Sequence, residues 1–269
     1  MIESADAAFA FRPVQVGSEG ASREWGIAVE APVELRLNGA PWSVMLASPS
    51  DLDDLAVGLA LTERLIATSR EVSGLHISQK SGDWTVDLDI PSPLREVRAR
   101  TIAGATGCGV CGLESLVDFH AGLSIPVAEV GTTAAVSDGA IQAAWSALPA
   151  LQPLNAATRS VHAAAWCTLE GQVVLVREDV GRHNALDKLV GALARQGRLG
   201  EPGFIAMTSR CSVELVSKAA VAHAALLATI SAPTTLALEV SERLGLPLAC
   251  AGPGHQVVRF PREAVHAAG

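Results

Sequence analysis

The sequence has no run of about twenty apolar residues, the length that a helix needs to cross a membrane. Its first residues, MIESADAAFAFRPVQV, lack the basic start and the long apolar core of a secretory signal peptide. These two absences exclude helical membrane spans and give no sign of export. We therefore expect no membrane partner.

Basic residues are in the minority. The chain has 20 lysines and arginines against 28 aspartates and glutamates, a formal net charge of -8. Generic nucleic-acid binding needs a basic surface, so the charge excludes that class of partner but is compatible with a local basic pocket. Apolar residues, by contrast, make up 49% of the 269 residues, enough to bury a sizeable core.

Cysteines are few as well. There are five, and an odd, sparse set does not make a disulfide framework. This favours a reducing, cytoplasmic location, where a C-x-x-C is more often metal-binding or catalytic than a structural bridge. Cys108 and Cys111 form such a motif inside the glycine-rich stretch TIAGATGCGVCGLESL.

The glycines around this motif predict a mobile loop that another backbone or a ligand can approach closely. A helix beginning after Gly112 would lower the pKa of a thiol at its N-terminus and make it more nucleophilic. A zinc half-site is the main alternative, but no second C-x-x-C exists, so His162, His183 or Cys167 would have to complete it. A thioredoxin-like dithiol is a weaker alternative, because a long polar loop precedes the motif.

The segment before this loop predicts a small α+β unit. VELRLNGAPWSVML alternates on both sides of the turn dipeptide Asn38-Gly39, which is a strong hairpin signal. SPSDLDDLAVGLALTERLI opens with Ser50 and Asp53 at capping-box spacing and continues with leucines at helical intervals. DWTVDLDI predicts a further strand.

The segment after the loop alternates between strands and helices. SDGAIQAAWSALPALQPL has a helical apolar stripe, and VHAAAWCTLEGQVVLVRED reads as two strands that turn at Glu170-Gly171. The strands FIAM, LLATI and LACA then alternate with the helices NALDKLVGALARQG, SVELVSKAAVAHA and TLALEVSERLG. This order predicts an α/β fold with a mostly parallel sheet covered by helices on both faces.

Four parts of the chain follow from these patterns. Residues 1–24 are predicted to be a flexible N-terminus and residues 25–100 a small α+β domain. Residues 101–136 hold the mobile C-x-x-C loop and its connection, and residues 137–269 form the α/β domain.

In a parallel sheet, ligands bind beyond the carboxyl ends of the strands. Here those ends carry REDVGRHN, TSRCS, SAPTT and CAGPGH, which are rich in small, polar or basic residues. Three of the four run into helix N-termini, which favour anions such as phosphates. The sequence therefore predicts a phosphate-binding edge.

Each basic residue at this edge has two interpretations. Arg182 and His183 in REDVGRHN belong either to a salt-bridge cluster or to the rim of a ligand site, and their position beyond a strand favours the site. Arg210 could hold a phosphate or be a solvated side chain beside ordinary helix capping. The turn at residues 252–255 could be a plain turn or a place where a ligand approaches the backbone closely. His162, beside an apolar strand, is interpreted as structural.

Several of these motifs together resemble one known family. TGCGVCGLESL, REDVGRHNALDKLVG, TSRCSVELVSKAA, SAPTTLALEV and AGPGHQVVRFP, with VELRLNG and LALTERLI near the start, resemble the FdhD family of formate dehydrogenase accessory sulfurtransferases. The likeness runs from about Ala31 to Ala264 and keeps the motif order.

The resemblance implies a sulfur-transfer function. Members accept sulfur as a persulfide from a cysteine desulfurase and pass it to the molybdenum (or tungsten) bis-guanine-dinucleotide cofactor, which is bound as substrate and then serves formate dehydrogenase. Cys108 matches the carrier thiol and Cys111 the second thiol. The family's cofactor-binding turn matches Cys250, Ala251, Gly252, Pro253, Gly254 and His255, and GDP would bind as a fragment of the cofactor. The family fold pairs a small N-terminal domain with a cytidine-deaminase-like α/β domain, and members tend to be homodimers.

Some positions depart from the family pattern. His255 stands where relatives commonly have arginine, and Arg159-Ser160 stands where they commonly have two glycines. The deaminase zinc signature is absent, because Ala163-Ala164 follows His162 and the C-x-x-C comes before it.

We therefore predict a cytoplasmic sulfurtransferase without a metal of its own. Cys108 and Cys111 are its catalytic residues, and its cofactor pocket combines residues 250–255 with Arg182, His183 and Arg210. The alternative is a non-catalytic chaperone that binds and delivers the cofactor while the C-x-x-C is idle or holds zinc.

Overall fold

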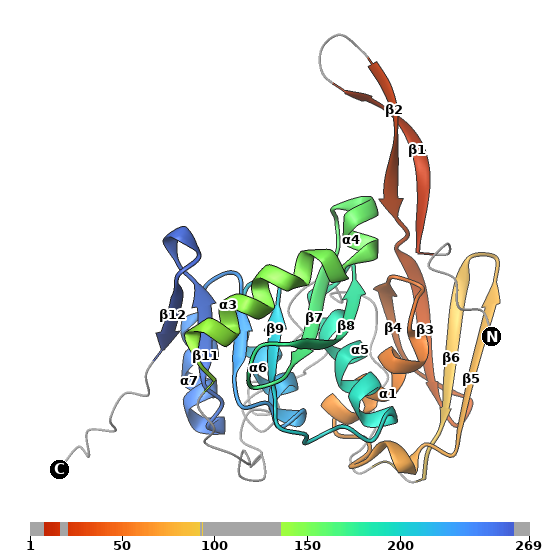
Figure 1. Cartoon of the computed structure of the whole chain (residues 1–269). Coiled ribbons are helices and arrows are strands. Elements are labelled where there is room, and N and C mark those ends of the chain that lie inside the picture. Colours follow the sequence, from red (N-terminus) through yellow and green to blue (C-terminus); the bar gives the residue numbers. More distant parts are fainter. Residues whose placement is uncertain (1–7, 17–20, 92, 94–135, 261–269) are drawn as a thin grey trace.

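The computed structural model describes residues 8–16, 21–91, 93 and 136–260, which form three β-sheets with helices packed around them. Figure 1 shows these sheets side by side, with the largest at the centre and left. The C-x-x-C stretch, with Cys108 and Cys111, lies outside the described residues, as does most of the loop predicted at 101–136.

The largest sheet has six strands in the order β12-β11-β10-β9-β7-β8. Its strands are β7 (His162–Cys167), β8 (Val173–Asp179), β9 (Phe204–Met207), β10 (Leu227–Thr229), β11 (Leu248–Ala251) and β12 (Val257–Phe260). β10 pairs in parallel with β9 and β11, whereas β7 is antiparallel to both β8 and β9. Strands β8, β9, β10 and β11 therefore point the same way, as predicted. β7 and the antiparallel edge strand β12 make the sheet mixed.

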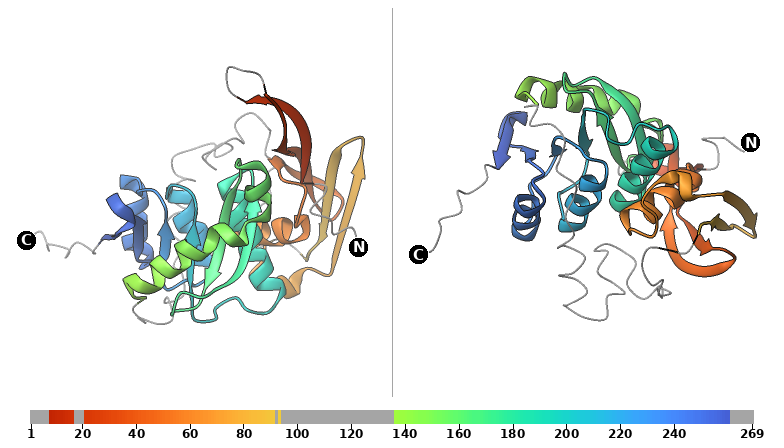
Figure 2. Two further views of the ribbon diagram at one scale, coloured as in Figure 1. Left: turned by 45° about the horizontal axis from the view of Figure 1, so that its top comes forward. Right: turned by 90° about the horizontal axis from the view of Figure 1, so that it is seen from below.

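Helices cover both faces of this sheet, which confirms the α/β class. α3 (Asp138–Ala147) lies on one face, and α5 (Arg182–Arg195), α6 (Val213–Val221) and α7 (Thr235–Leu244) lie on the other (Figure 2). The side chains of β7 alternate between the two cores: Ala163, Ala165 and Cys167 pack on the α3 side, and Ala164 and Trp166 on the other. The predicted apolar stripe of α3 is buried, and Ser137 caps the helix by accepting a hydrogen bond from the Ala140 N–H. A 3-10 turn (Leu148–Leu151) and the short α4 (Pro153–Thr158) follow α3.

A second sheet has the order β4-β3-β6-β5. Its strands are β3 (Ala31–Leu37), β4 (Ala40–Ala47), β5 (Gly74–Lys80) and β6 (Asp83–Asp89), with a 3-10 turn (Ser69–Glu71) before β5. The predicted hairpin is confirmed: Asn38 and Gly39 both have positive φ, 53° and 79°, as a tight two-residue turn requires.

Helix α1 (Leu52–Thr62) joins the two sheets, because it packs along α5 and contributes to one continuous core with β3 and β9. The helices cross at glycines. A Cβ atom on Gly58 would lie 1.8 Å from the Asp187 carbonyl oxygen, and one on Gly191 would lie 1.9 Å from that of Asp54. This close approach requires glycine at both positions.

The capping box predicted for α1 is wrong. The helix begins at Leu52, and its N-cap is Asp51, which has a left-handed backbone and no side-chain cap hydrogen bond. Instead of reaching back to Ser50, the Asp53 carboxylate accepts from the Asp54 N–H and pairs with Arg195 on α5. A tertiary ion pair therefore replaces the local cap.

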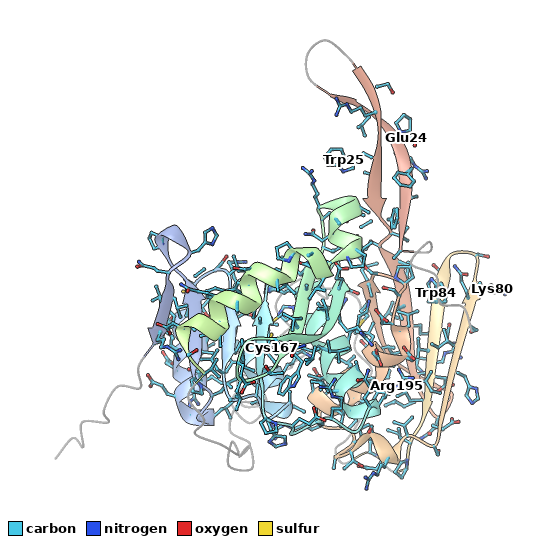
Figure 3. All side chains as sticks on the ribbon, viewed as in Figure 1. Glu24, Trp25, Lys80, Trp84, Cys167 and Arg195 are labelled. Atoms are coloured by element: carbon cyan, nitrogen blue, oxygen red, sulfur yellow. The ribbon has the colours of Figure 1, made fainter. Side chains whose placement is uncertain are left out.

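The N-terminal residues form an arm that the sequence analysis assigned to a flexible segment. β1 (Phe9–Val16) pairs with β2 (Ala21–Ala28), and the ribbon projects from the body (Figure 1). α4 packs against β2, where Gly26 leaves no room for a Cβ beside the Ala157 carbonyl. Trp25 lies on the arm (Figure 3), and the Arg159 guanidinium carbon lies 5.4 Å from the centre of its ring. Both ribbon faces keep exposed side chains, so the strands lack the half-buried alternation that identifies strands in a sequence.

Candidate functional site

The strand ends that were predicted to meet at one edge of the sheet do so. Thr229 of β10 lies between Met207 of β9 and Cys250 of β11, so these three strands end together. Beyond β9 and β10, Cys211 bridges Pro233, which holds the two following loops beside each other. β8 points the same way and leads into α5 at Arg182. The four predicted loops therefore share one edge of the sheet.

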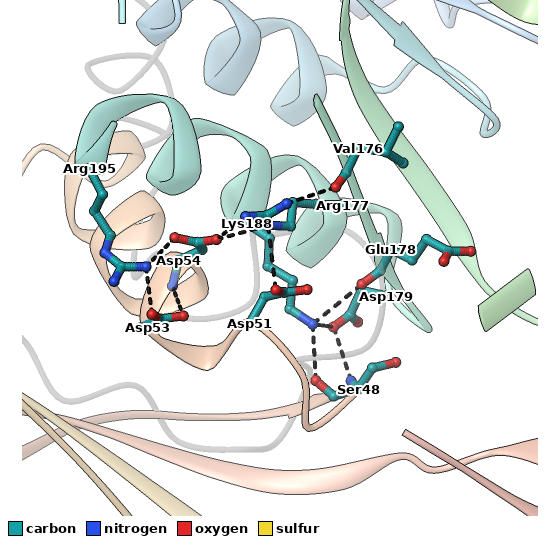
Figure 4. A network of polar contacts seen from close by, with 10 residues as sticks. All are labelled: Ser48, Asp51, Asp53, Asp54, Val176, Arg177, Glu178, Asp179, Lys188 and Arg195. Carbon is teal, nitrogen blue, oxygen red and sulfur yellow. Dashed lines mark hydrogen bonds and ion pairs between the residues drawn. The ribbon is translucent and has the colours of Figure 1, made fainter. Parts of the chain in front are cut away.

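The segment Arg177–Asp179, in the first half of REDVGRHN, is a buried salt-bridge cluster (Figure 4). The Arg177 guanidinium contacts the Asp54 carboxylate at 2.7 and 2.8 Å. Burial raises the pKa of Asp54, and the charges of Arg177 and Arg195 offset part of that rise. Glu178 accepts hydrogen bonds from the Leu154 and Asn155 N–H groups, so it caps α4 rather than facing a ligand.

Asp179 is the centre of this cluster. Its carboxylate lies 2.6 Å from Lys188 Nζ, and both side chains are fully buried. It also accepts from the Ser48 and Gly181 N–H groups and from the Asn184 side chain. The pair thereby ties β4, β8 and α5 together. The salt-bridge interpretation is therefore correct for Arg177 and Asp179.

Arg182 and His183 lie at the sheet edge, where a ligand rim stays a prediction. They are the first two residues of α5 and both are half-buried. His183 Nε2 lies 2.8 Å from Glu214 Oε2 and 3.3 Å from the Ser212 hydroxyl, both from the start of α6. This contact holds the N-termini of α5 and α6 beside each other at the sheet edge.

The N-termini of α5 and α6 share a second property. Their N-caps, Gly181 and Ser212, make no side-chain cap hydrogen bond, whereas Thr234 at the start of α7 accepts one from the Ala237 N–H. The first-turn N–H groups of α5 and α6 are thus not satisfied by their own caps, as in sites that bind phosphate at helix N-termini.

The remaining predicted residues lie further along this edge. Arg210 is exposed in the loop between β9 and α6. Residues 250–255 form the end of β11 and the tight turn into β12. Gly254 and His255 there have positive φ, 69° and 59°. A Cβ on Gly252 would lie 2.6 Å from Val258 Cγ2, so a larger residue at this position would have to displace the Val258 side chain. His255 is exposed. The segment is a tight turn at the predicted edge, and the approach of a ligand to it stays a prediction.

His162 begins β7, opposite Asp179 in the register. Burial lowers the pKa of its imidazole, and the charges of Arg182 and His183 lower it further. His162 is thus favoured as a neutral side chain beside the basic rim. Its half-buried position agrees with the structural role predicted for it.

The three described cysteines are buried. Burial raises the pKa of Cys167 and of Cys211 to about 12 each, and the neighbouring Cys250 adds to the effect at Cys211. Burial also raises the pKa of Cys250. All three therefore stay protonated at neutral pH and are poor nucleophiles.

Within the described residues there is no group of three His, Cys, Asp or Glu side chains that could hold a metal ion. Cys167 and His162, two of the ligands considered for a zinc site, lie at opposite ends of β7. In the same part of the chain, no helix is long and apolar enough to cross a membrane.

Two residues at the edge were missed by the sequence analysis, Glu214 and the structural lysine Lys188. Glu214 follows the polar loop TSRCS, and an S-x-E spacing from Ser212 was the only local signal. Lys188 lies between buried leucines on α5, where a sequence pattern predicts only a helical position. For neither residue do the neighbouring positions in the sequence indicate which side chain it contacts.

Comparison with known proteins identifies relatives over most of the chain. The model of the FdhD/NarQ family matches residues 28–260. A protein of Variovorax paradoxus named sulfur carrier protein FdhD is 46% identical over 85% of this chain and 81% of its own length. One of the same name from Chromobacterium violaceum is 45% identical over 86% and 87%.

The fold has a counterpart in a crystal structure of a Desulfotalea psychrophila protein described as a formate dehydrogenase accessory protein. The TM-score is 0.69 at 19% identity, and the match covers 94% of this chain and 95% of that one. The family model spans the four-stranded and six-stranded sheets, and the two relatives align with more than four-fifths of the sequence, so the chain belongs to the FdhD/NarQ family.

Proposed function

We propose that this protein is a sulfur carrier that serves formate dehydrogenase. It accepts sulfur as a persulfide on Cys108 from a cysteine desulfurase and transfers it to the molybdenum (or tungsten) bis-guanine-dinucleotide cofactor. The observation that carries the proposal is the likeness to curated sulfur carrier proteins at 45–46% identity over most of the chain. The cytoplasmic location and the homodimer stay predictions.

The thiol chemistry supports this assignment by elimination. Of the five cysteines, Cys167, Cys211 and Cys250 are buried with raised pKa values, so the C-x-x-C pair holds the remaining thiols. In the first step, the Cys108 thiolate attacks the terminal sulfur of the desulfurase persulfide. The new S–S bond forms as the old one breaks, and the desulfurase cysteine leaves as a thiolate. Delivery as sulfide needs two electrons, which Cys111 can supply by forming a disulfide with Cys108 that a dithiol reductant later opens.

The sheet edge supports the second step of the proposal, the transfer of sulfur to a bound cofactor. A dinucleotide carries a diphosphate, and the N-termini of α5 and α6 meet at this edge without side-chain caps. Arg182, His183 and Arg210 add basic side chains to a chain that is acidic overall. The edge therefore suits the nucleotide tails of the cofactor.

Intact mass spectrometry tests the carrier role. After incubation with a cysteine desulfurase and cysteine, the wild type should gain sulfur, and Cys108→Ala should lose that gain together with formate dehydrogenase activation. Cys167→Ala is the matched control and should keep both, because that thiol is buried in β7. Stoichiometric zinc with no gain of sulfur would instead support the non-catalytic chaperone.

Calorimetry with GDP tests the cofactor edge. Arg210→Ala should weaken binding about tenfold or more, as expected for one lost charge-assisted hydrogen bond. If His255 takes the place of a family arginine, affinity should fall from about pH 6 to 8 as imidazole loses its charge. His255→Arg should flatten that dependence, because guanidinium stays charged.

A further inference from the structure

Three carboxylates lie near the sheet edge, and two of them are fully engaged. Glu178 accepts two backbone N–H groups of α4, at 2.9 and 2.8 Å. Asp179 accepts from two backbone N–H groups, one amide and the buried Lys188. Neither has an oxygen left for a ligand without breaking the buried cluster.

Glu214 is different. Its Oε2 accepts from His183 Nε2 at 2.8 Å and from the Ser212 hydroxyl at 3.3 Å. Its Oε1 has no hydrogen-bond partner among the described residues, and 15% of the side chain is exposed. One oxygen is therefore held by two donors, which fixes the carboxylate and leaves the other oxygen open.

The Glu214 carboxylate is unsuited to hold phosphate, because both are anionic, but suited to a group with adjacent hydrogen-bond donors. An ionised carboxylate only accepts hydrogen bonds. Guanine presents two neighbouring donors, its N1–H and its 2-amino group, whereas adenine presents a lone pair at N1 and has no 2-amino group. Facing a carboxylate, adenine therefore loses the hydrogen bonds and adds a repulsive contact.

We propose that Glu214 is the residue that selects guanine over adenine at this edge, accepting from the guanine N1–H and 2-amino group. The inference rests on the proposed function, which places a guanine nucleotide here. The basic residues and the helix N-termini bind the diphosphate, and Glu214 reads the base. His183 and Ser212 act as positioning residues that orient the carboxylate.

A purely structural role for Glu214 makes a different prediction. A first-turn glutamate is favourable at any helix N-terminus, and its pair with His183 ties α6 to α5. If that were all, its loss would weaken the binding of every nucleotide by the same factor. Only a residue that contacts the base would change the ratio of the affinities for GDP and ADP.

The test is calorimetric titration of the full chain with GDP, IDP and ADP. The wild type should bind GDP about tenfold or more tightly than ADP, the discrimination of one charge-assisted hydrogen bond. IDP, which lacks the 2-amino group, should lie between them. Glu214→Gln should bring GDP and ADP to nearly equal affinity, because an amide donates as well as accepts. Glu239→Gln, an exposed glutamate on neighbouring α7, should keep the wild-type ratio.

The possible failures are distinguishable. An unchanged GDP-to-ADP ratio in Glu214→Gln overturns the inference, even if all three affinities fall together, and leaves the proposed function intact. No GDP binding by the wild type at millimolar ligand overturns the nucleotide site itself and the inference with it. Thermal melting of both variants checks that each is folded.

Discussion

Replacing glycine by alanine should have opposite effects on stability at two positions. It should destabilise the protein at Gly191, where α1 and α5 cross, and stabilise it at Gly139 in α3. Gly191→Ala would place a Cβ 1.9 Å from the Asp54 carbonyl oxygen, where real Cβ contacts essentially never fall below 3.0 Å. The helices must therefore separate by about 1.1 Å, the difference between these two distances. Overpacking of this kind costs about 1–3 kcal/mol. That outweighs the gain in helix propensity from glycine to alanine, about 1 kcal/mol at most.

Gly139→Ala is the matched control. This glycine also lies in a helix, α3, but a Cβ there meets nothing closer than the Ser137 hydroxyl at 3.8 Å. Alanine should stabilise the protein by about 0.4–1 kcal/mol, because it restricts the unfolded chain without a clash. Gly58→Ala should resemble Gly191→Ala. The double variant should cost less than the sum of the two, since one separation of the helices relieves both clashes.

Urea denaturation and thermal melting measure these differences. At about 2–4 °C per kcal/mol for a chain of this size, Gly191→Ala should melt about 2–12 °C below the wild type. Gly139→Ala should melt slightly above it. If the two alanine variants shifted together in either direction, the close crossing would not be what requires glycine.

Three further predictions follow from buried groups. Lys188→Met should lower the free energy of unfolding, measured by urea titration, by about 3–5 kcal/mol, because it leaves the Asp179 carboxylate buried without its cation. The surface substitution Arg198→Met is the control and should lower it by about 1 kcal/mol or less. Cys167 and Cys211, with pKa values of about 12, should resist iodoacetamide at pH 8 until the protein is unfolded, and peptide mapping that found either modified in the native state would contradict their burial. His162 has a lowered pKa in the folded state, so unfolding takes up a proton and stability should fall as pH drops below about 6.5. His162→Gln should make that fall shallower, and an identical pH profile for the variant would exclude this contribution.

Much of the fold could be predicted from the sequence because its signals are local. The Asn38-Gly39 turn, the apolar stripe of α3 and the strand FIAM depend on residues within about ten positions of one another. The alternation of strands and helices then implies which strand ends share an edge. Arg210 and residues 250–255 accordingly lie at the edge that this alternation predicts.

Which side chains face each other could not be predicted in this way. Arg177 and Arg182 belong to one eight-residue motif, yet the first pairs with Asp54, 123 positions away, and the second begins a helix at the rim. The arm of β1 and β2 was also missed, because it keeps exposed apolar side chains where a sequence pattern expects a half-buried face.

Apart from the arm of β1 and β2, the order of the elements and the edge where their ends meet could be inferred from the sequence, because backbone propensity and hydrophobic periodicity act over a few residues. The packing of distant segments, by contrast, pairs Asp179 with Lys188, lets α1 and α5 touch at two glycines, and leaves one oxygen of Glu214 open. These contacts depend on the energy of bringing distant groups out of water together, which no local pattern records.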